Sequence, residues 1–285
     1  ALLLQLVVAG ALAVRRYRSN AADSVRDTPF VRPPHMLPAW DGLREFRVVE
    51  REFEDAARSV CSFYLEPVDS LPLPLFKAGQ FITISLHVPV PGQNSKIVTR
   101  CYSLSSKPGD ERFRISVKRA TAPANLPDVP AGLASNHLHD HVDVGAVVGL
   151  KAPSGQFHID PDAGIPLVLV AGGIGVTPLL SMLLWCLDKQ PTRTIHFYCG
   201  ARNGKEQAFK PLLETLAERH PNLHLAFVRS GPSSDETIGV DYHHRGHVDT
   251  DLLRRTLPFG RHAYYVCGPA AMMESLVPGL LGWGV

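Results

Sequence analysis

The sequence predicts an α+β protein of two domains, an antiparallel β-barrel followed by an α/β domain built on a parallel sheet. Its 285 residues suit two domains of ordinary size. Short runs of β-branched and aromatic residues, separated by Pro and Gly, fill the first half and are typical of a small barrel. From residue 166, wholly apolar runs alternate with helical stretches, as in a parallel sheet covered on both faces. We therefore expect domains at 40–162 and 163–285.

The barrel is expected to contain several short strands and one helix. The strands lie at 47–49, 60–65, 81–88 and 113–117, and the helix at 134–142. Pro and Gly between these runs interrupt strand pairing and supply turn geometry.

The second domain is expected to alternate strands with helices. The strands lie at 167–170, 195–199, 223–228 and 263–266, and the helices at 178–187, 207–219, 249–257 and from 270 onward. This order predicts a parallel sheet with helices on both faces.

The N-terminal segment has a different character. Residues 1–14 are apolar apart from Gln5, and three arginines follow within residues 15–18. A membrane-spanning helix needs about 20 residues, so we predict that 1–19 is a truncated membrane anchor with a positive flank. A buried terminal helix of an upstream domain and a cropped signal peptide stay open as alternatives. Residues 20–39 are polar and contain four prolines, which predicts a linker.

Charge and cysteine usage exclude several classes of function. The net charge is +2 and no basic stripe is visible, so nucleic acid is not an expected partner. None of the five cysteines forms a Cys-x-x-Cys pair, which argues against a zinc site or an iron–sulfur cluster. Their odd number and wide spacing argue against a secreted disulfide scaffold. We expect a reducing compartment and a cytoplasmic location, with a tether to a membrane if 1–19 is an anchor.

A glycine-rich turn carries the strongest local signal for ligand binding. It contains Gly173, Gly175, Thr177 and Pro178, directly after an apolar strand and at the start of a helix. Glycines at such a turn let the backbone approach a pyrophosphate, and the helix N-terminus supplies free N–H groups. We place Pro178 at the first helical position. The third glycine of the usual dinucleotide motif is replaced by proline, and no acidic residue follows the second strand, so a purely structural turn stays open.

Two further motifs stand at strand ends. Arg100-Cys101-Tyr102-Ser103-Leu104 lies on or beside a barrel strand, and Cys267-Gly268-Pro269 ends a parallel strand. Taken in order, the three motifs resemble those of the ferredoxin–NADP reductase superfamily, most closely the reductase parts of flavohaemoglobins and of oxygenase reductases. Four further stretches agree with this resemblance: 78–81, 115–119, 132–142 and 153–157. The resemblance covers residues 40–285.

The resemblance implies that the barrel binds FAD. Tyr102 would pack on the flavin ring, Ser103 would hydrogen-bond near flavin N5, and Arg100 would face the pyrophosphate. The other residues implied at this cofactor are Phe81, Leu104, Val117, Lys118, Gly132, Leu133, Ala134 and Ser135.

The resemblance also implies that the second domain binds NADH or NADPH. Gly173, Gly175, Thr177 and Pro178 would hold the dinucleotide, and Cys267, Gly268 and Pro269 would lie beside the nicotinamide. Tyr102, Ser103 and Cys267 are therefore the candidate catalytic residues. Arg202 would lie near a 2′-phosphate, with Lys205 close by, and no carboxylate is expected there, which tilts the preference toward NADPH.

The implied activity is electron transfer from NAD(P)H through FAD to a haem, an iron–sulfur centre or another redox partner. One alternative is the reductase part of a flavohaemoglobin that detoxifies nitric oxide, which predicts an upstream globin. Another is a non-catalytic subunit that only binds nucleotide, which predicts loss of the Tyr-Ser pair.

The sequence departs from the family at two places. The loop 120–130 is longer and richer in proline, and relatives continue beyond residue 285 into one more strand over the nicotinamide side of the flavin. The second domain is therefore expected to lack its last strand.

Two histidine clusters raise the question of a metal site. They consist of His137, His139 and His141, and of His243, His244 and His247. The first falls in the helix that the family places behind the flavin phosphates. The second falls in a charged, Gly-rich loop that we expect to be solvated, so we expect no metal at either cluster.

Overall fold

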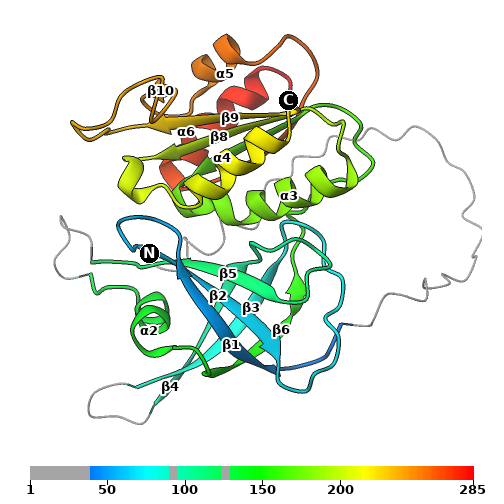
Figure 1. Ribbon diagram of the computed structural model, residues 1–285, viewed down its shortest axis with the longest axis vertical. Helices are drawn as coiled ribbons and strands as arrows, with labels where there is room; N and C mark the ends of the chain where they lie inside the picture. Colours follow the sequence, from blue (N-terminus) through cyan, green and yellow to red (C-terminus); the bar gives the residue numbers. More distant parts are fainter. Residues whose placement is uncertain (1–38, 90–94, 123–128) are drawn as a thin grey trace, which may run out of the picture.

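The computed structural model describes residues 39–89, 95–122 and 129–285. It contains two domains, each built on one sheet, and the domains lie one above the other in Figure 1. One sheet is antiparallel and the other is parallel with helices, which confirms the predicted fold class. The predicted anchor at 1–19 and nearly all of the linker at 20–39 lie outside the described residues, as does part of the loop 120–130. In the described ranges, no helix is long and apolar enough to cross a membrane.

The antiparallel sheet has six strands in the order β4-β3-β6-β1-β2-β5. They are β1 (Arg44–Phe53), β2 (Val60–Pro67), β3 (Phe81–Val88), β4 (Lys96–Ser103), β5 (Phe113–Lys118) and β6 (Val147–Ser154). A bridge between Leu104 and Ile115 brings the two outer strands together, as a barrel requires. Helix α2 (Leu133–His141) lies at one side of this domain, in the view of Figure 1.

Strand β6 was not expected from the sequence. It pairs with both β1 and β3, so it lies in the middle of the sheet. Gly149 and Pro153 interrupt its apolar pattern, and both residues are weak strand formers.

The parallel sheet has five strands in the order β10-β9-β8-β7-β11. They are β7 (Leu167–Gly172), β8 (Ile195–Ala201), β9 (Leu223–Arg229), β10 (His244–Arg245) and β11 (Ala263–Cys267). The helices are α3 (Val176–Lys189), α4 (Lys210–Arg219), α5 (Thr250–Thr256) and α6 (Ala270–Gly282), with short 3-10 turns η2 (Gly173–Gly175) and η3 (Gly204–Glu206). In the described residues, β11 forms one edge of the parallel sheet.

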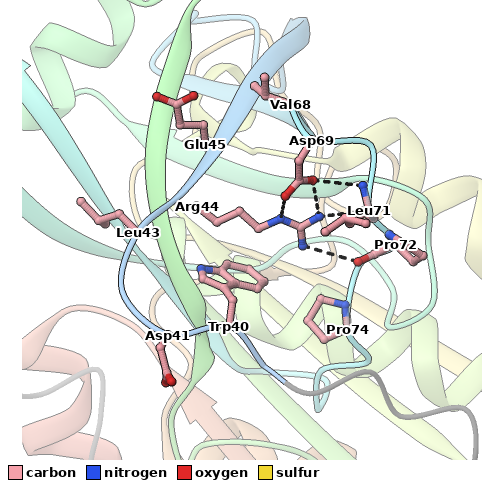
Figure 2. A pocket seen from close by; sticks show the side chains of 10 residues that line it. All are labelled: Trp40, Asp41, Leu43, Arg44, Glu45, Val68, Asp69, Leu71, Pro72 and Pro74. Carbon is pink, nitrogen blue, oxygen red and sulfur yellow. Dashed lines mark hydrogen bonds and ion pairs between the residues drawn. The ribbon is translucent and has the colours of Figure 1, made fainter.

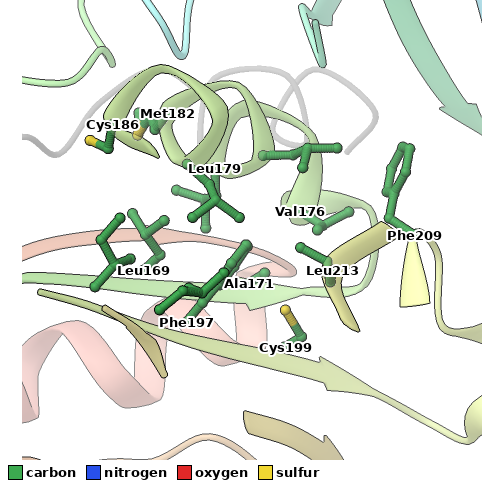
Figure 3. Close-up of a cluster of buried hydrophobic side chains, with 14 of the residues drawn as sticks. Leu169, Ala171, Val176, Leu179, Met182, Cys186, Phe197, Cys199, Phe209 and Leu213 are labelled. Atoms are coloured by element: carbon green, nitrogen blue, oxygen red, sulfur yellow. The ribbon is translucent and has the colours of Figure 1, made fainter. Parts of the chain in front are cut away.

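Alternate residues of β7 face two separate apolar clusters, since successive side chains of a strand point to opposite faces. Leu167 and Leu169 pack with α3 and α4, in the cluster that Figure 3 shows. Val168 and Val170 pack with α5 and α6 instead. The sheet is therefore covered on both faces, as its apolar strands predict.

Helix α3 begins at Val176, so Pro178 is its third residue. The prediction that Pro178 is the first helical residue is wrong. The short turn η2 absorbs the change of direction after β7, which lets the helix start two residues earlier. Pro178 still lies in the first turn, where a missing N–H removes no helical hydrogen bond.

The two domains share a packed contact. Val60 and Ala78 of the barrel belong to the same apolar cluster as α3, and a Cβ at Gly79 would collide with the Met182 side chain. Backbone hydrogen bonds also cross the contact, with Phe209 N–H donating to Glu54 O across 3.0 Å. The barrel and the parallel sheet therefore hold a defined mutual position.

Candidate cofactor site

The glycine turn is shaped by packing against the end of β11. A Cβ at Gly175 would collide with the Cys267 carbonyl, and one at Gly172 would lie 2.7 Å from Met272 Sδ and 2.8 Å from Pro269 Cδ. These two glycines are therefore required by the close approach of two chain segments.

Gly173 is different from its neighbours. Its φ is +52°, a conformation that glycine adopts at little cost, and a Cβ there would meet nothing within 4 Å. The side of the turn away from β11 is therefore open, next to the first N–H groups of α3. This is the geometry in which a backbone can cradle a phosphate.

Residues Cys267, Gly268 and Pro269 lie beside this turn, because β11 pairs with β7 so that Cys267 is level with Ala171. Burial raises the pKa of the Cys267 thiol to about 11, so the thiol stays protonated near neutral pH. The Thr177 hydroxyl donates to Ile174 O across 3.1 Å and so stabilises the turn itself.

The carboxyl ends of β8 and β9 carry the residues predicted near a 2′-phosphate. Arg202 and Lys205 are exposed there. The structure adds a carboxylate that the sequence analysis missed, since Glu236 lies 2.8 Å from the Cβ position of Gly204. The expectation that no carboxylate stands at this edge is therefore wrong. Glu236 comes from a later loop, and only the fold brings it to this edge.

Glu236 is held by a buried arginine. Arg229 is 0% exposed, and its Nε lies 3.2 Å from the Glu236 carboxylate. Burial alone would raise the pKa of Glu236, but N–H donors from Ser233 and Gly204 and the charge of Arg229 outweigh it and lower this pKa. The Glu236 carboxylate is therefore ionised near neutral pH and paired with the Arg229 cation.

Strand β4 presents the predicted flavin-facing residues. Arg100, Tyr102 and Ser103 pair with Ile84, Ile82 and Phe81 of β3. Tyr102 packs against the barrel core, and burial raises the pKa of its phenol to about 12 against a smaller opposing effect of Arg100. The Ser103 hydroxyl makes no hydrogen bond with the described part of the chain. Arg100 donates to Thr99 O across 2.8 Å.

Other predicted residues line the same end of the barrel. Val117 and Lys118 end β5, and the Phe81 ring packs so close to Gly155 that a Cβ there would lie 2.8 Å from it. Leu104 is fully buried in the barrel core, so its side chain serves packing.

Helix α2 has an uncapped N-terminus. Gly132 precedes the helix, no side chain caps it, and its first turn contains no acidic residue. The N–H groups of Leu133, Ala134 and Ser135 therefore have no helical acceptor and can bind an anion. The Ser135 hydroxyl already bonds Gly132 O and Ala120 N, each at 3.3 Å, so it supports the loop.

The two histidine clusters differ in their surroundings. His139 is buried, and its Nε2 lies 2.8 Å from Val117 O, which ties α2 to β5. His243 is exposed, as expected for a solvated cluster, and its Nδ1 accepts a hydrogen bond from Phe227 N–H at 3.0 Å. In the part of the chain that the structure describes, no group of three or more His, Cys, Asp or Glu residues is placed to hold a metal.

A cavity of about 610 Å³ lies elsewhere on the barrel, at the start of β1 (Figure 2). Arg44 is the charged residue at its centre, and it donates to both oxygens of Asp69 at 2.7 and 2.9 Å. It also donates to Leu71 O, and its guanidinium lies 5.2 Å from the Trp40 ring centre. Arg44 therefore fixes the loop after β2, and none of the predicted site residues lines this cavity.

The glycine turn lies at the domain contact, since residues of β5 approach η2 within 8 Å between Cα atoms. The open side of Gly173 and the free N–H groups of α2 both fit phosphate-bearing cofactors. A barrel and a parallel sheet that each offer such a cradle define a flavin- and dinucleotide-dependent oxidoreductase.

Comparison with known families agrees with this class. Residues 45–159 match the model of the oxidoreductase FAD-binding domain, and residues 169–277 match that of the oxidoreductase NAD-binding domain. The chain belongs to the FAD- and NAD-binding oxidoreductases of the ferredoxin–NADP reductase type, as its motifs predicted. FAD and a nicotinamide dinucleotide are therefore its cofactors.

Individual relatives point to flavohemoproteins. The chain is 39% identical to a flavohemoprotein of Rhodopirellula baltica over 251 residues, which are 88% of this chain and 60% of that protein. It is similar to the crystal structure of the flavohem-like FAD/NAD-binding domain of a Vibrio cholerae nitric oxide dioxygenase, with a TM-score of 0.71, 30% identity and coverage of 85% and 94% of the two chains. The cytochrome b5 reductase domain of Ulva prolifera nitrate reductase shares the fold at 21% identity, with a TM-score of 0.72 and coverage of 89% and 96%.

Proposed function

We propose that this chain takes electrons from NADH or NADPH through FAD and passes them to a haem-containing acceptor. The observation that carries the proposal is that the glycine turn of one domain lies against β5, the strand of the other domain that ends in Val117 and Lys118. When bound, FAD would supply the chemistry that links a two-electron nicotinamide donor to a one-electron acceptor. The protein aligns the two rings.

The predicted residues supply this alignment. Tyr102 is a neutral aromatic surface for the flavin, because burial keeps its phenol protonated. Ser103 offers a hydroxyl toward flavin N5, and Val117 and Lys118 line the neighbouring strand. Cys267 offers a small, protonated side chain beside the nicotinamide, so it acts by contact and not as a base.

The phosphates are assigned to the two cradles. The N-terminus of α2, from Gly132 to Ser135, takes those of FAD, with Arg100 opposite. Gly173, Gly175, Thr177 and Pro178 take those of the dinucleotide, and Gly268 and Pro269 close the site from β11.

The haem acceptor rests on the relatives. The chain spans about 60% of the length of the curated relatives it matches, and these are flavohemoproteins. The reductase part of a flavohaemoglobin-like nitric oxide dioxygenase is therefore the most specific form of this proposal. An iron–sulfur acceptor remains the second candidate. A non-catalytic nucleotide-binding subunit is disfavoured, because Tyr102 and Ser103 are both present.

The cellular setting belongs to the same proposal. A cytoplasmic location rests on cysteine usage, and a membrane tether rests on the apolar run and the arginines of residues 1–19 alone. The structure lends the tether no support.

The proposal is tested by loading the purified chain with FAD and mixing it with NADH or NADPH without oxygen. We expect a flavin spectrum that bleaches, and the faster donor identifies the preferred dinucleotide. A chain that stays colourless with added FAD, or a bound flavin that neither dinucleotide bleaches, would contradict the proposal.

A further inference from the structure

A buried hydrogen bond joins helix α3 of the second domain to the segment that follows β4 in the barrel. Ser181 lies in α3, and its hydroxyl donates to Ser106 O in the barrel across 2.7 Å. Ser181 is 0% exposed and Ser106 is 5% exposed. A buried hydroxyl without a hydrogen-bond partner destabilises the fold, so this bond favours one fixed distance between Ser181 and Ser106.

On the helix side, Ser181 is rigidly connected to the glycine turn. It lies one helical turn after Thr177, so both residues are on the same face of α3. Thr177 in turn bonds Ile174 O within η2. The Ser181 hydroxyl and the glycine turn therefore keep a fixed position relative to each other.

On the barrel side, the segment after Ser103 is equally constrained. Leu104 N–H donates to Gln80 O at 2.9 Å, and Ser105 N–H donates to Arg114 O at 2.8 Å. The Ser105 hydroxyl lies 2.8 Å from that of Ser116, which lies 2.7 Å from that of Ser62. This ladder of buried hydroxyls joins Ser105 to β5 and β2, so the Ser181–Ser106 bond connects α3 to the rest of the barrel.

Backbone hydrogen bonds such as that from Phe209 N–H to Glu54 O also cross the contact, but the other side-chain links are weaker than the Ser181 bond. The ion pairs Lys118–Glu206 and Lys107–Asp188 have N···O distances of 3.6 and 3.5 Å, and all four side chains are about a third exposed. Solvated pairs of this kind define geometry poorly, because water and salt screen them.

We infer that Ser181 is a positioning residue for hydride transfer. Through Ser106 it fixes the glycine turn relative to Ser103, three residues away, and so sets how closely the nicotinamide approaches the flavin. The inference rests on the proposed function. Displacements of about 1 Å between reacting groups can cost up to a hundredfold in rate.

The test compares Ser181→Ala with Tyr198→Phe in the FAD-loaded chain. The control also removes a hydroxyl hydrogen bond, the 2.7 Å contact of Tyr198 with Thr256, but on the opposite face of the sheet. For Ser181→Ala we expect the limiting rate of anaerobic flavin reduction to fall about tenfold. The dinucleotide dissociation constant and FAD content should stay within about twofold of the unmodified chain. A limiting rate unchanged in Ser181→Ala, or lowered equally in Tyr198→Phe, would overturn the inference.

Hydrogen exchange separates this inference from the proposed function. The amides of Leu104 and Ser105 should exchange faster in Ser181→Ala than in the unmodified chain or in Tyr198→Phe, without any dinucleotide present. Equal amide exchange rates in all three proteins would contradict the positioning role of Ser181, even if the flavin of the unmodified chain is reduced normally. A chain that neither dinucleotide reduces would contradict the proposed function, while exchange still decides whether Ser181 fixes the segment.

Discussion

At the scale of single residues, the site depends on small groups held in fixed positions. Ser103 follows directly after the half-buried Tyr102 at the end of β4, and its hydroxyl forms no hydrogen bond with the described residues. Its motif could be found in the sequence, because it lies within five consecutive residues. Glu236 could not be found, since it reaches the edge of the sheet from a loop more than thirty residues away from Ala201.

Replacing Ser103 with Ala should slow flavin reduction about tenfold, because one hydrogen bond to the reacting ring is worth about 1.4 kcal/mol in the transition state. FAD content should not change, since the phosphate cradle at α2 is untouched. Stopped-flow mixing with NADH measures the rate. Ser85→Ala, on the neighbouring strand β3, is the matched control. Equal reduction rates for both variants and the unmodified chain would contradict a role of Ser103 in flavin reduction.

Replacing Arg202 with Ala should weaken NADPH binding about tenfold, since it removes one charge-assisted contact to a 2′-phosphate. NADH binding should not change. Titration of both dinucleotides measures this, with exposed Arg219→Ala as the control. An unchanged affinity for NADPH would contradict the role of Arg202 at a 2′-phosphate.

His196 should make stability depend on pH. Burial, together with His224 and His262, lowers its pKa to about 4, so the folded state favours the neutral ring. The unfolded chain binds a proton near pH 6.5, and stability should fall by about 2 kcal/mol between pH 7 and pH 5. His196→Phe should flatten this slope in thermal unfolding, whereas a change at exposed His87 should not. Equal slopes in both variants would contradict the assignment.

At the scale of elements, apolar periodicity predicted the parallel strands well. β7 is apolar throughout and β8 is apolar apart from His196, and this pattern predicts the positions of both strands. Short or interrupted elements were missed, because β10 has two residues and β6 contains Gly149 and Pro153. The start of α3 was placed at Pro178, although η2 lets the helix begin at Val176.

The glycine turn offers a paired test of structural and binding roles. Gly175→Ala should destabilise the fold by about 3 kcal/mol, because its Cβ meets the Cys267 carbonyl. Gly173→Ala should cost only about 1 kcal/mol, since its Cβ enters open space with a positive φ. It should nevertheless weaken dinucleotide binding. Thermal unfolding and titration measure the two effects, and normal dinucleotide affinity of Gly173→Ala would contradict the cradle.

At the scale of the whole molecule, function depends on the contact between the barrel and the parallel sheet. The ordered motifs indicated both domains and their cofactors. They could not show how the domains meet, because that contact joins distant residues such as Ser181 with Ser106 and Phe209 with Glu54. Those pairs follow from side-chain packing in three dimensions and leave no periodic pattern in the sequence.

The central claim is that a hydride passes directly from the nicotinamide to FAD across this contact. The most direct measurement is single-turnover reduction of the FAD-loaded chain with NADH or NADPH that carries deuterium at the transferred position. We predict that flavin bleaching is slower with the deuterated donor. Bleaching at the same rate with both donors would show that another step controls reduction, and a flavin that stays oxidised would contradict the account.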